Sequence, residues 1–296
     1  MQRIKFIVVS ALGLALLAGL TGTGTAGLPY QSTWTIFVTS DREGKDADIY
    51  GMNVNGTNVR TLTSSPKFDG GGVLSPNGRK ILFYSQRSPY GDVWVMSADG
   101  SGQRNLSRNA AHDGGGSWSP DGRRIAFDSN RDGNGEIYVM NADGSGQRIL
   151  SSSPSSNEDS PQWSPDGRTI AFHTDRDGNP ELYTMNADGS EPRNLTRNAA
   201  YDSPGLWSPD GRTIVFASAR DTRDQDNTEL YVMNADGSKV RRLTRTPGGE
   251  YLLGWSPDGK KLAFQRYPST PRWAFYVMNA DGSGIGKVTW SLPRRG

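Results

Sequence analysis

A tetrapeptide recurs along the chain at a nearly constant spacing, and this period constrains the fold more than any other feature. Successive copies begin 44, 45, 44 and 48 residues apart. A second mark, an aromatic residue followed two positions later by Met, has the same period. A period of about 45 residues with several short strands is typical of propeller blades. The Ser-Pro-(Asp/Asn)-Gly copies start at Ser75, Ser119, Ser164, Ser208 and Ser256, and the aromatic residues are Tyr50, Trp94, Tyr138, Tyr183, Tyr231 and Tyr276.

One unit, residues 160–196, shows how each copy divides into strands. Its first apolar run stops at Pro165, which cannot donate to a ladder, and an Asp-Gly hairpin signal follows. Residues 169–174 alternate apolar and polar side chains, and residues 182–185 are rich in large apolar ones. Residues 193–196 follow a second Asp-Gly turn. The sequence therefore predicts an all-β fold, a six-bladed β-propeller of four-stranded blades over residues 27–296.

The first 26 residues have the layout of a secretory signal peptide. Arg3 and Lys5 precede an apolar run at 6–20, and small residues lead to Ala26, the expected last residue before cleavage. The run is short for a membrane span, although a retained anchor is the alternative. The chain has no Cys, so neither a lipid-anchored cysteine nor a disulfide can form. We expect a periplasmic or extracellular protein, monomeric, with no membrane span after cleavage.

Export would change the charge balance of the chain. It has 33 basic and 31 acidic residues, and loss of Arg3 and Lys5 leaves equal numbers. A neutral domain without a Lys/Arg run is a poor candidate for binding nucleic acid. Intrinsic disorder is also disfavoured, because disordered chains lack this alternation and aromatic content.

The repeats resemble those of the TolB family of propellers. The unit Trp118–Leu150, WSPDGRRIAFDSNRDGNGEIYVMNADGSGQRIL, carries the resemblance, which extends over about residues 33–290. It implies a six-bladed propeller, exported in many members and used mainly as a binding platform. TolB itself has an α/β domain before its propeller, and prolyl-oligopeptidase-like enzymes carry a hydrolase domain. Neither is expected here, so partners and catalysis that depend on those domains are not carried over.

The first blade has a weak copy of the repeat. Its inner strand is expected at residues 28–31, with the ring closed by packing rather than by a strand exchanged between the termini. One column of the repeat, directly before Ser-Pro, is expected to pack between neighbouring blades, because large aromatic side chains bury much apolar surface. It contains Leu74, Trp118, Trp163, Trp207 and Trp255. We expect all four tryptophans to be well buried.

A second pair of columns flanks the loop after each second strand. Arginines recur at Arg42, Arg87, Arg131, Arg176 and Arg220, and acids follow at Asp48, Asp92, Glu136, Glu181 and Glu229. The last copy has Pro268 and Ala274 at these positions. Joint loss predicts an ion pair across the hairpin, Arg131 with Glu136 and Arg176 with Glu181. A calcium site at Asp128-x-Asn130-x-Asp132-Gly133 or Asp175-x-Asp177-Gly178 is the alternative, although the Glu expected at loop position twelve is missing.

A third column lies before each inner strand, six residues ahead of Ser-Pro. Inner strands of a propeller line the central channel, so equivalent positions at their starts should surround one opening. Each carboxylate could cap its own loop by accepting backbone N–H bonds. Alternatively, the set could form an acidic, aromatic-edged mouth that receives a cation or a basic peptide loop. The expected binding residues are Asp69, Asp113, Glu158, Asp202 and Glu250, with His112, Tyr201 and Tyr251 beside them, as are Phe68 and Asp159.

Catalysis has little support in the sequence. There are two His residues, His112 and His173, no Cys and no Gly-x-Ser-x-Gly motif. His173 follows Phe172 in an expected strand and is interpreted as structural. We therefore predict an exported, non-enzymatic scaffold without cofactor or metal, which binds a protein or peptide at the acidic mouth. A carbohydrate-active or metal-assisted lyase or hydrolase that uses channel carboxylates is the alternative.

Overall fold

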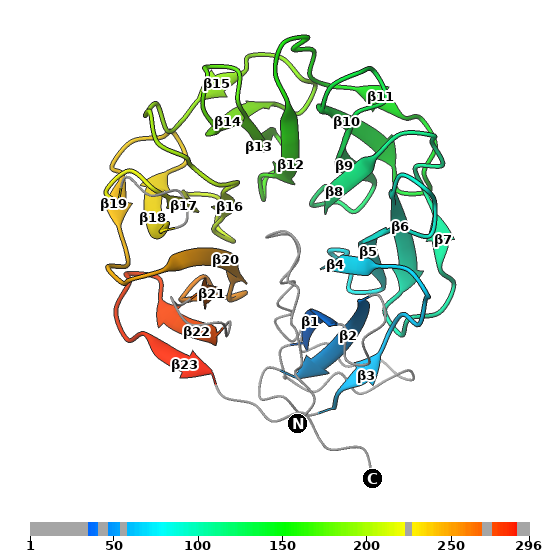
Figure 1. Ribbon diagram of the computed structural model, residues 1–296, viewed down its shortest axis with the longest axis horizontal. Helices are drawn as coiled ribbons and strands as arrows, with labels where there is room; N and C mark the ends of the chain where they lie inside the picture. The colour runs from blue at the N-terminus through cyan, green and yellow to red at the C-terminus, as the bar shows by residue number, and fades with distance from the viewer. Residues whose placement is uncertain (1–34, 41–46, 54–57, 223–226, 268–273, 289–296) are drawn as a thin grey trace.

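The computed structural model describes residues 35–40, 47–53, 58–222, 227–267 and 274–288. Six antiparallel sheets are arranged in a ring around a central axis (Figure 1). We number the sheets in chain order as blades 1 to 6. Blade 1 comprises β1 (Thr35–Ser40), β2 (Asp48–Asn53) and β3 (Arg60–Thr61); blade 2 comprises β4 (Asp69–Leu74), β5 (Lys80–Ser85), β6 (Asp92–Ser97) and β7 (Arg104–Asn105).

The other four blades each contain four strands, ordered from the axis outward (Figure 1). Blade 3 comprises β8 (Asp113–Trp118), β9 (Arg124–Ser129), β10 (Glu136–Asn141) and β11 (Arg148–Ile149). Blade 4 comprises β12 (Glu158–Trp163), β13 (Thr169–Thr174), β14 (Glu181–Asn186) and β15 (Arg193–Asn194). Blade 5 comprises β16 (Leu206–Trp207), β17 (Thr213–Ser218), β18 (Glu229–Asn234) and β19 (Arg241–Arg242). Blade 6 comprises β20 (Gly249–Trp255), β21 (Lys261–Tyr267), β22 (Ala274–Asn279) and β23 (Gly286–Val288).

The predicted all-β propeller with four-stranded blades is confirmed, but the predicted number of such blades is not. Five blades have four strands, and blade 1 has three among the described residues. The inner strand expected at 28–31, the signal segment 1–26 and the closure of the ring lie outside the described residues. Within the described part of the chain, no helix has the length and apolar character of a membrane span.

The recurring Ser-Pro-Asp-Gly turn forms the hairpin between the inner and second strands. In blade 4, the Ser164 hydroxyl donates to Asp166 Oδ1 at 2.6 Å, and the same oxygen accepts the Arg168 N–H at 3.1 Å. Gly167 has φ of 71°, the left-handed region that glycine adopts most readily. The aspartate is therefore part of the hairpin's own hydrogen bonding, as the sequence predicted.

The tryptophan column packs between blades, as expected. Trp118 lies in a cluster with Leu82 and Val95 of blade 2, and its Nε1–H donates to the Val73 carbonyl at 3.2 Å. Trp163 and Trp255 are likewise buried against the preceding blade.

Trp207 is less buried than the other three tryptophans and has an intermediate exposure. The inner strand of blade 5 is reduced to two residues, because Pro204 interrupts the ladder between it and the isolated Asp202–Ser218 bridge.

Candidate functional site

The five carboxylates expected to form an acidic mouth are fully buried, and each is paired with an arginine of its own blade. This neutralises the negative charge that the predicted mouth required. In blade 3, for example, Arg131 Nη2 lies 2.8 Å from Asp113 Oδ1, and the Asp113 side chain is 0% exposed. The pairs are Asp69–Arg87, Asp113–Arg131, Glu158–Arg176, Asp202–Arg220 and Glu250–Arg266.

The arginine column was therefore predicted to pair with the wrong acids. Arg131 follows the second strand, and the antiparallel register places that end beside the start of the inner strand, where Asp113 pairs with Ser129. Its guanidinium also lies 4.6 Å from the centre of the Tyr138 ring. Arg176 likewise bonds Glu158 rather than Glu181. Arg42 lies outside the described residues.

The second acidic column holds the third strand to the chain that follows the fourth. Glu136 accepts the Ser151 hydroxyl at 2.7 Å and the Ser153 N–H at 2.8 Å. Asp92 accepts the Ser107 hydroxyl at 2.8 Å in the same manner. These acids therefore stabilise the outer edges of blades that carry them, and among the described residues none forms an ion pair with the arginine column across the hairpin.

Blade 6 has the same buried ion pair as blades 2 to 5, although Pro268 in the arginine column suggested that its arginine was lost. Strand β21 is seven residues long, and Arg266 within it donates from Nε and Nη2 to Glu250 Oε1 at 3.0 and 2.7 Å. Arg266 lies two positions before Pro268, the residue that aligns with the arginines of the other blades, so the sequence alignment of the repeats did not reveal it. The register pairs Glu250 directly with Arg266.

The loops proposed to bind calcium direct their oxygens to separate protein partners. Asn130 Oδ1 accepts the His112 N–H at 2.9 Å, and Asp132 accepts the Tyr138 hydroxyl. Asp175 accepts the Asn157 N–H at 2.7 Å. The described residues contain no group of three His, Cys, Asp or Glu side chains that could hold a metal ion.

The positions next to the buried acids differ from blade to blade. In each blade, the residue directly after the buried acid of the inner strand pairs with a residue of the second strand, close to the axis of the ring. From blade 2 to blade 6 these opposing residues are Gly70 and Tyr84, Gly114 and Asp128, Asp159 and His173, Ser203 and Ala217, and Tyr251 and Gln265. Unlike the ion pairs, these positions carry a different chemistry in every blade.

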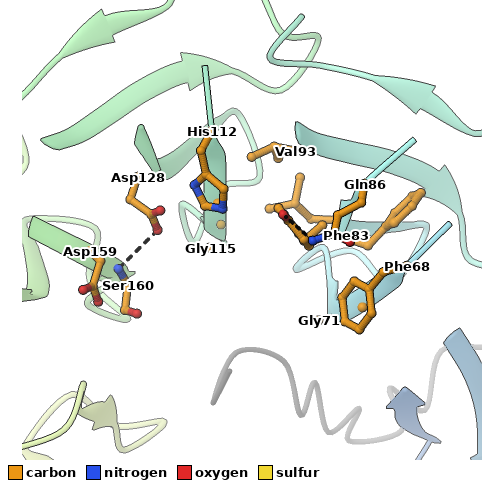
Figure 2. A pocket seen from close by; sticks show the side chains of 15 residues that line it. Phe68, Gly71, Phe83, Gln86, Val93, His112, Gly115, Asp128, Asp159 and Ser160 are labelled. Atoms are coloured by element: carbon orange, nitrogen blue, oxygen red, sulfur yellow. Dashed lines mark hydrogen bonds between the residues drawn. The ribbon is translucent and has the colours of Figure 1, made fainter. Parts of the chain in front are cut away.

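A pocket of about 400 Å³ opens where these positions meet in blades 2, 3 and 4. Phe68 and Tyr84 form an aromatic wall, with ring centres 6.1 Å apart, and the Tyr84 ring lies 5.6 Å from that of His112. Figure 2 shows His112 between this wall and the two carboxylates, Asp128 and Asp159. The pocket thus has an aromatic side and an acidic side.

Glycine backbone keeps the pocket open between its two sides. A Cβ atom at Gly114 would lie 2.7 Å from Asp128 Oδ2 and 2.8 Å from His112 Cε1. Any side chain at this position would therefore displace one of these groups. In blade 4 the equivalent position is Asp159, whose side chain is half-exposed.

The backbone of Ser160 binds Asp128 from the neighbouring blade. Its N–H donates to Asp128 Oδ1 at 3.3 Å (Figure 2). Ser160 has φ of 55° and lies where the register of β12 shifts. The equivalent residues of blades 2 and 3 are Gly71 and Gly115, which also have positive φ. A non-glycine residue in the left-handed region is strained, and such strain is often found at functional sites.

Burial raises the pKa of Asp128 to about 8, and the nearby charge of Asp159 adds to this effect. The Ser160 N–H acts in the opposite direction, and Asp113 contributes a smaller increase. Asp128 is therefore mostly protonated at neutral pH when the pocket is empty.

The arc of polar and aromatic residues continues into blades 4 and 5. His173 Nδ1 lies 3.4 Å from Asp159 Oδ2, and the His173 ring contacts that of Tyr201 edge-on at 5.9 Å. Burial, followed by the charge of Asp159, raises the pKa of Tyr201 to about 12. Tyr251 is 46% exposed.

Of the predicted binding residues, His112 lines the pocket and Tyr201 contacts His173 beside it. The five buried acids do not line it. Sequence reasoning did not select Tyr84, and it named Asp128 only in the alternative calcium motif and not as a residue of the channel mouth. The signal that could have found both residues is that they break the repeat at positions facing the axis.

Comparison with known proteins identifies the family. A sequence profile described as the TolB beta propeller domain matches residues 73–159 and 144–226, together more than half of the chain. The chain belongs to this family. A search of curated proteins found no match.

Solved structures share the fold. A TolB-like protein from Agrobacterium tumefaciens is 24% identical with a TM-score of 0.70, covering 80% of this chain and 86% of its own. TolB from Acinetobacter baumannii is 21% identical with a TM-score of 0.69, covering 80% of this chain and 58% of its own. An oligogalacturonate lyase from Vibrio parahaemolyticus is 16% identical with a TM-score of 0.62, covering 86% of this chain and 74% of its own. At these identities the likeness is one of fold.

Proposed function

We propose that this TolB-like propeller is an exported binding scaffold that takes a segment of a partner protein into the pocket of blades 2, 3 and 4. The supporting observation is that the pocket is built from the positions at which the blades differ. The repeated positions hold the blades together, whereas Phe68, Tyr84, His112, Asp128 and Asp159 depart from the repeat and converge on one cavity.

The dimensions of the pocket favour a protruding segment over a flat surface. Its volume of about 400 Å³ falls within the range of roughly 300–1,000 Å³ for ligand pockets, and it holds only a few side chains. Aromatic residues such as Phe68 and Tyr84 supply contact area at a low cost in conformational entropy. A loop or peptide that inserts one or two side chains therefore fits the site.

The test is selection of binding peptides from a displayed random library on the purified protein, followed by calorimetric titration of the selected peptides. Tyr84→Ala should weaken the selected peptides at least tenfold, because it removes part of the aromatic wall. Tyr90→Ala is the matched control, since Tyr90 is 56% exposed and does not line the pocket. Equal affinity for both variants would refute the proposal.

A second candidate function is acid–base catalysis on a saccharide. Asp128, with its pKa raised to about 8, is a proton donor at neutral pH, and the carboxylate of Asp159 lies nearby. A protonated and an ionised carboxyl group are the pair that glycoside cleavage uses. Incubation with oligogalacturonate and other acidic or neutral oligosaccharides, with new chain ends as the readout, tests it. Activity abolished by Asp128→Asn would support the enzyme, and no cleavage by the wild type would reject it for those substrates.

A further inference from the structure

The carboxyl groups near the starts of the inner strands, on these strands or on the second strands beside them, fall into two groups. Five are each bonded to an arginine of the same blade. Asp128 and Asp159 form the exception: among the described residues, neither has an arginine or lysine within ion-pair distance. The neighbour of Asp159 is His173, at 3.4 Å. The protein supplies a cation for every structural acid of this set and none for the two acids that face the pocket.

We propose that the pocket binds a basic side chain, lysine or arginine, whose cationic end lies between Asp128 and Asp159. This inference rests on the proposed function and specifies the chemistry of the inserted segment. Burial disfavours the charged form of a carboxyl group unless a cation pairs with it, so a ligand cation would favour the charged form here, as the arginines do in the five buried pairs. The cation then supplies the ion-pair partner that neither carboxyl group has among the described arginines and lysines.

The orientation of Asp128 fits this role. Its Oδ1 accepts the Ser160 N–H, which fixes the carboxyl group from the neighbouring blade. Its Oδ2 faces the space above Gly114, where an added Cβ would lie 2.7 Å away. One oxygen is thus used for positioning, and the other is directed at the space that a ligand would fill.

The opposite wall suits the hydrocarbon stem of such a side chain. Lysine and arginine carry apolar stems that pack on aromatic surfaces while the charged end seeks a polar partner. Phe68 and Tyr84 provide this surface, and His112 lies between it and the two carboxyl groups. Figure 2 shows Phe68 on the side of the pocket away from Asp128 and Asp159. A cation passing over the Tyr84 face would also gain a favourable contact with the ring.

The probe is capped lysine, N-acetyl-lysine methylamide, titrated into the full chain and followed by NMR. Capped norleucine has a similar stem without the charge. We expect capped norleucine to bind at least tenfold more weakly, and Asp128→Asn or Asp159→Asn each to weaken capped lysine by about tenfold or more. Weaker binding by either single variant tests the ion pair. Asp159 is half-exposed, so its substitution disturbs little packing even if Asp128→Asn does not fold.

The chain itself offers a matched control. Asp121→Asn with Asp166→Asn removes two negative charges at the opposite ends of the inner strands of blades 3 and 4. Asn77 already occupies the equivalent position in blade 2 and makes the same bonds, from the Ser75 hydroxyl at 2.8 Å and the Arg79 N–H at 3.1 Å. This variant should bind capped lysine as the wild type does, which separates a local ion pair from a general charge effect.

Three results would overturn the inference. They are equal binding of capped norleucine, binding of calcium chloride in place of capped lysine, and tighter binding of the free diamine putrescine than of capped lysine. If capped lysine fails but Tyr84→Ala still weakens the selected peptides, the proposed function stands and this inference falls. If capped lysine binds at Asp128 but Tyr84→Ala leaves the peptides unaffected, the proposed function falls instead.

Discussion

Two carboxyl groups lie on adjacent strands of blade 3, and one has an arginine partner whereas the other has none among the described residues. Asp113 is fully buried and bonded to Arg131, and the same arrangement recurs in four other blades. Asp128, on the adjacent strand, lies near Asp159 of blade 4, and its Oδ1 accepts the backbone N–H of Ser160. The first site is complete within the protein, whereas the second lacks a cation. In this propeller, repetition marks the residues that stabilise the blades, and departure from repetition marks the pocket.

The largest expected effect comes from breaking the complete site. Arg131→Ala leaves Asp113 buried without a counter-ion and should lower the free energy of unfolding by about 3–5 kcal/mol, measured by chemical denaturation. The double variant Arg131→Ala with Asp113→Asn removes the stranded charge and should recover part of this loss. A loss below about 1 kcal/mol in the single variant would show that the repeated pair is not a major source of stability.

The incomplete site should respond to pH in the opposite sense from a stabilising salt bridge. The pKa of Asp128 is raised from 3.8 to about 8 on folding, so its contribution to stability is full below pH 4 and is lost as pH rises towards 8. The neighbouring charges are Asp159, near His173, and Asp113, paired with Arg131.

Asp128→Asn removes this titration. The unfolding free energy of the variant, relative to the wild type, should therefore increase between pH 4 and pH 8, by an amount on the order of a few kcal/mol. Parallel curves for the two proteins across this range would contradict the assignment. Asp121→Asn, at a turn aspartate whose pKa is lowered by the Ser119 hydroxyl, serves as the control.

The smallest effect concerns the strained backbone beside the pocket. Ser160→Gly places glycine where Gly71 and Gly115 stand in the neighbouring blades, and relief of the left-handed φ should stabilise the protein by about 0.5–1 kcal/mol. Thermal unfolding measures the change, and Gly71→Ser, the reverse exchange, should destabilise. A lower melting temperature for Ser160→Gly would show that the serine side chain contributes more than its backbone strain costs.

The propeller was predictable because its signals are local and repeated. Asp-Gly turns and alternating strands recur with one period, and a tryptophan precedes Ser-Pro in four of the five copies. The packing of neighbouring blades buries the apolar positions of these strands. The exceptions are positions where one blade departs from the others. Pro204 shortens the inner strand of blade 5 and leaves Trp207 half-buried, and a longer β21 places Arg266 two residues ahead of its expected column.

The site was less predictable, because it depends on which columns face each other. The sequence aligned Arg131 with Glu136 along the hairpin, whereas the antiparallel register brings it to Asp113 on the other neighbouring strand. The pocket joins Asp128 of blade 3 to Ser160 of blade 4, a contact between residues that occupy different columns of the repeat. His112 was selected as a neighbour of the inner strand, but only the fold shows that it lies beside Tyr84 and Asp128.

The most direct test of the missing cation is an NMR titration of the Asp128 carboxyl carbon, assigned by comparison with Asp128→Asn. The account predicts that this group titrates near pH 8 in the empty protein and that saturating capped lysine lowers its pKa by at least one unit. A carboxyl group that titrates near pH 4 in the empty protein, and does not respond to capped lysine, would show that Asp128 is already compensated and would contradict the central claim.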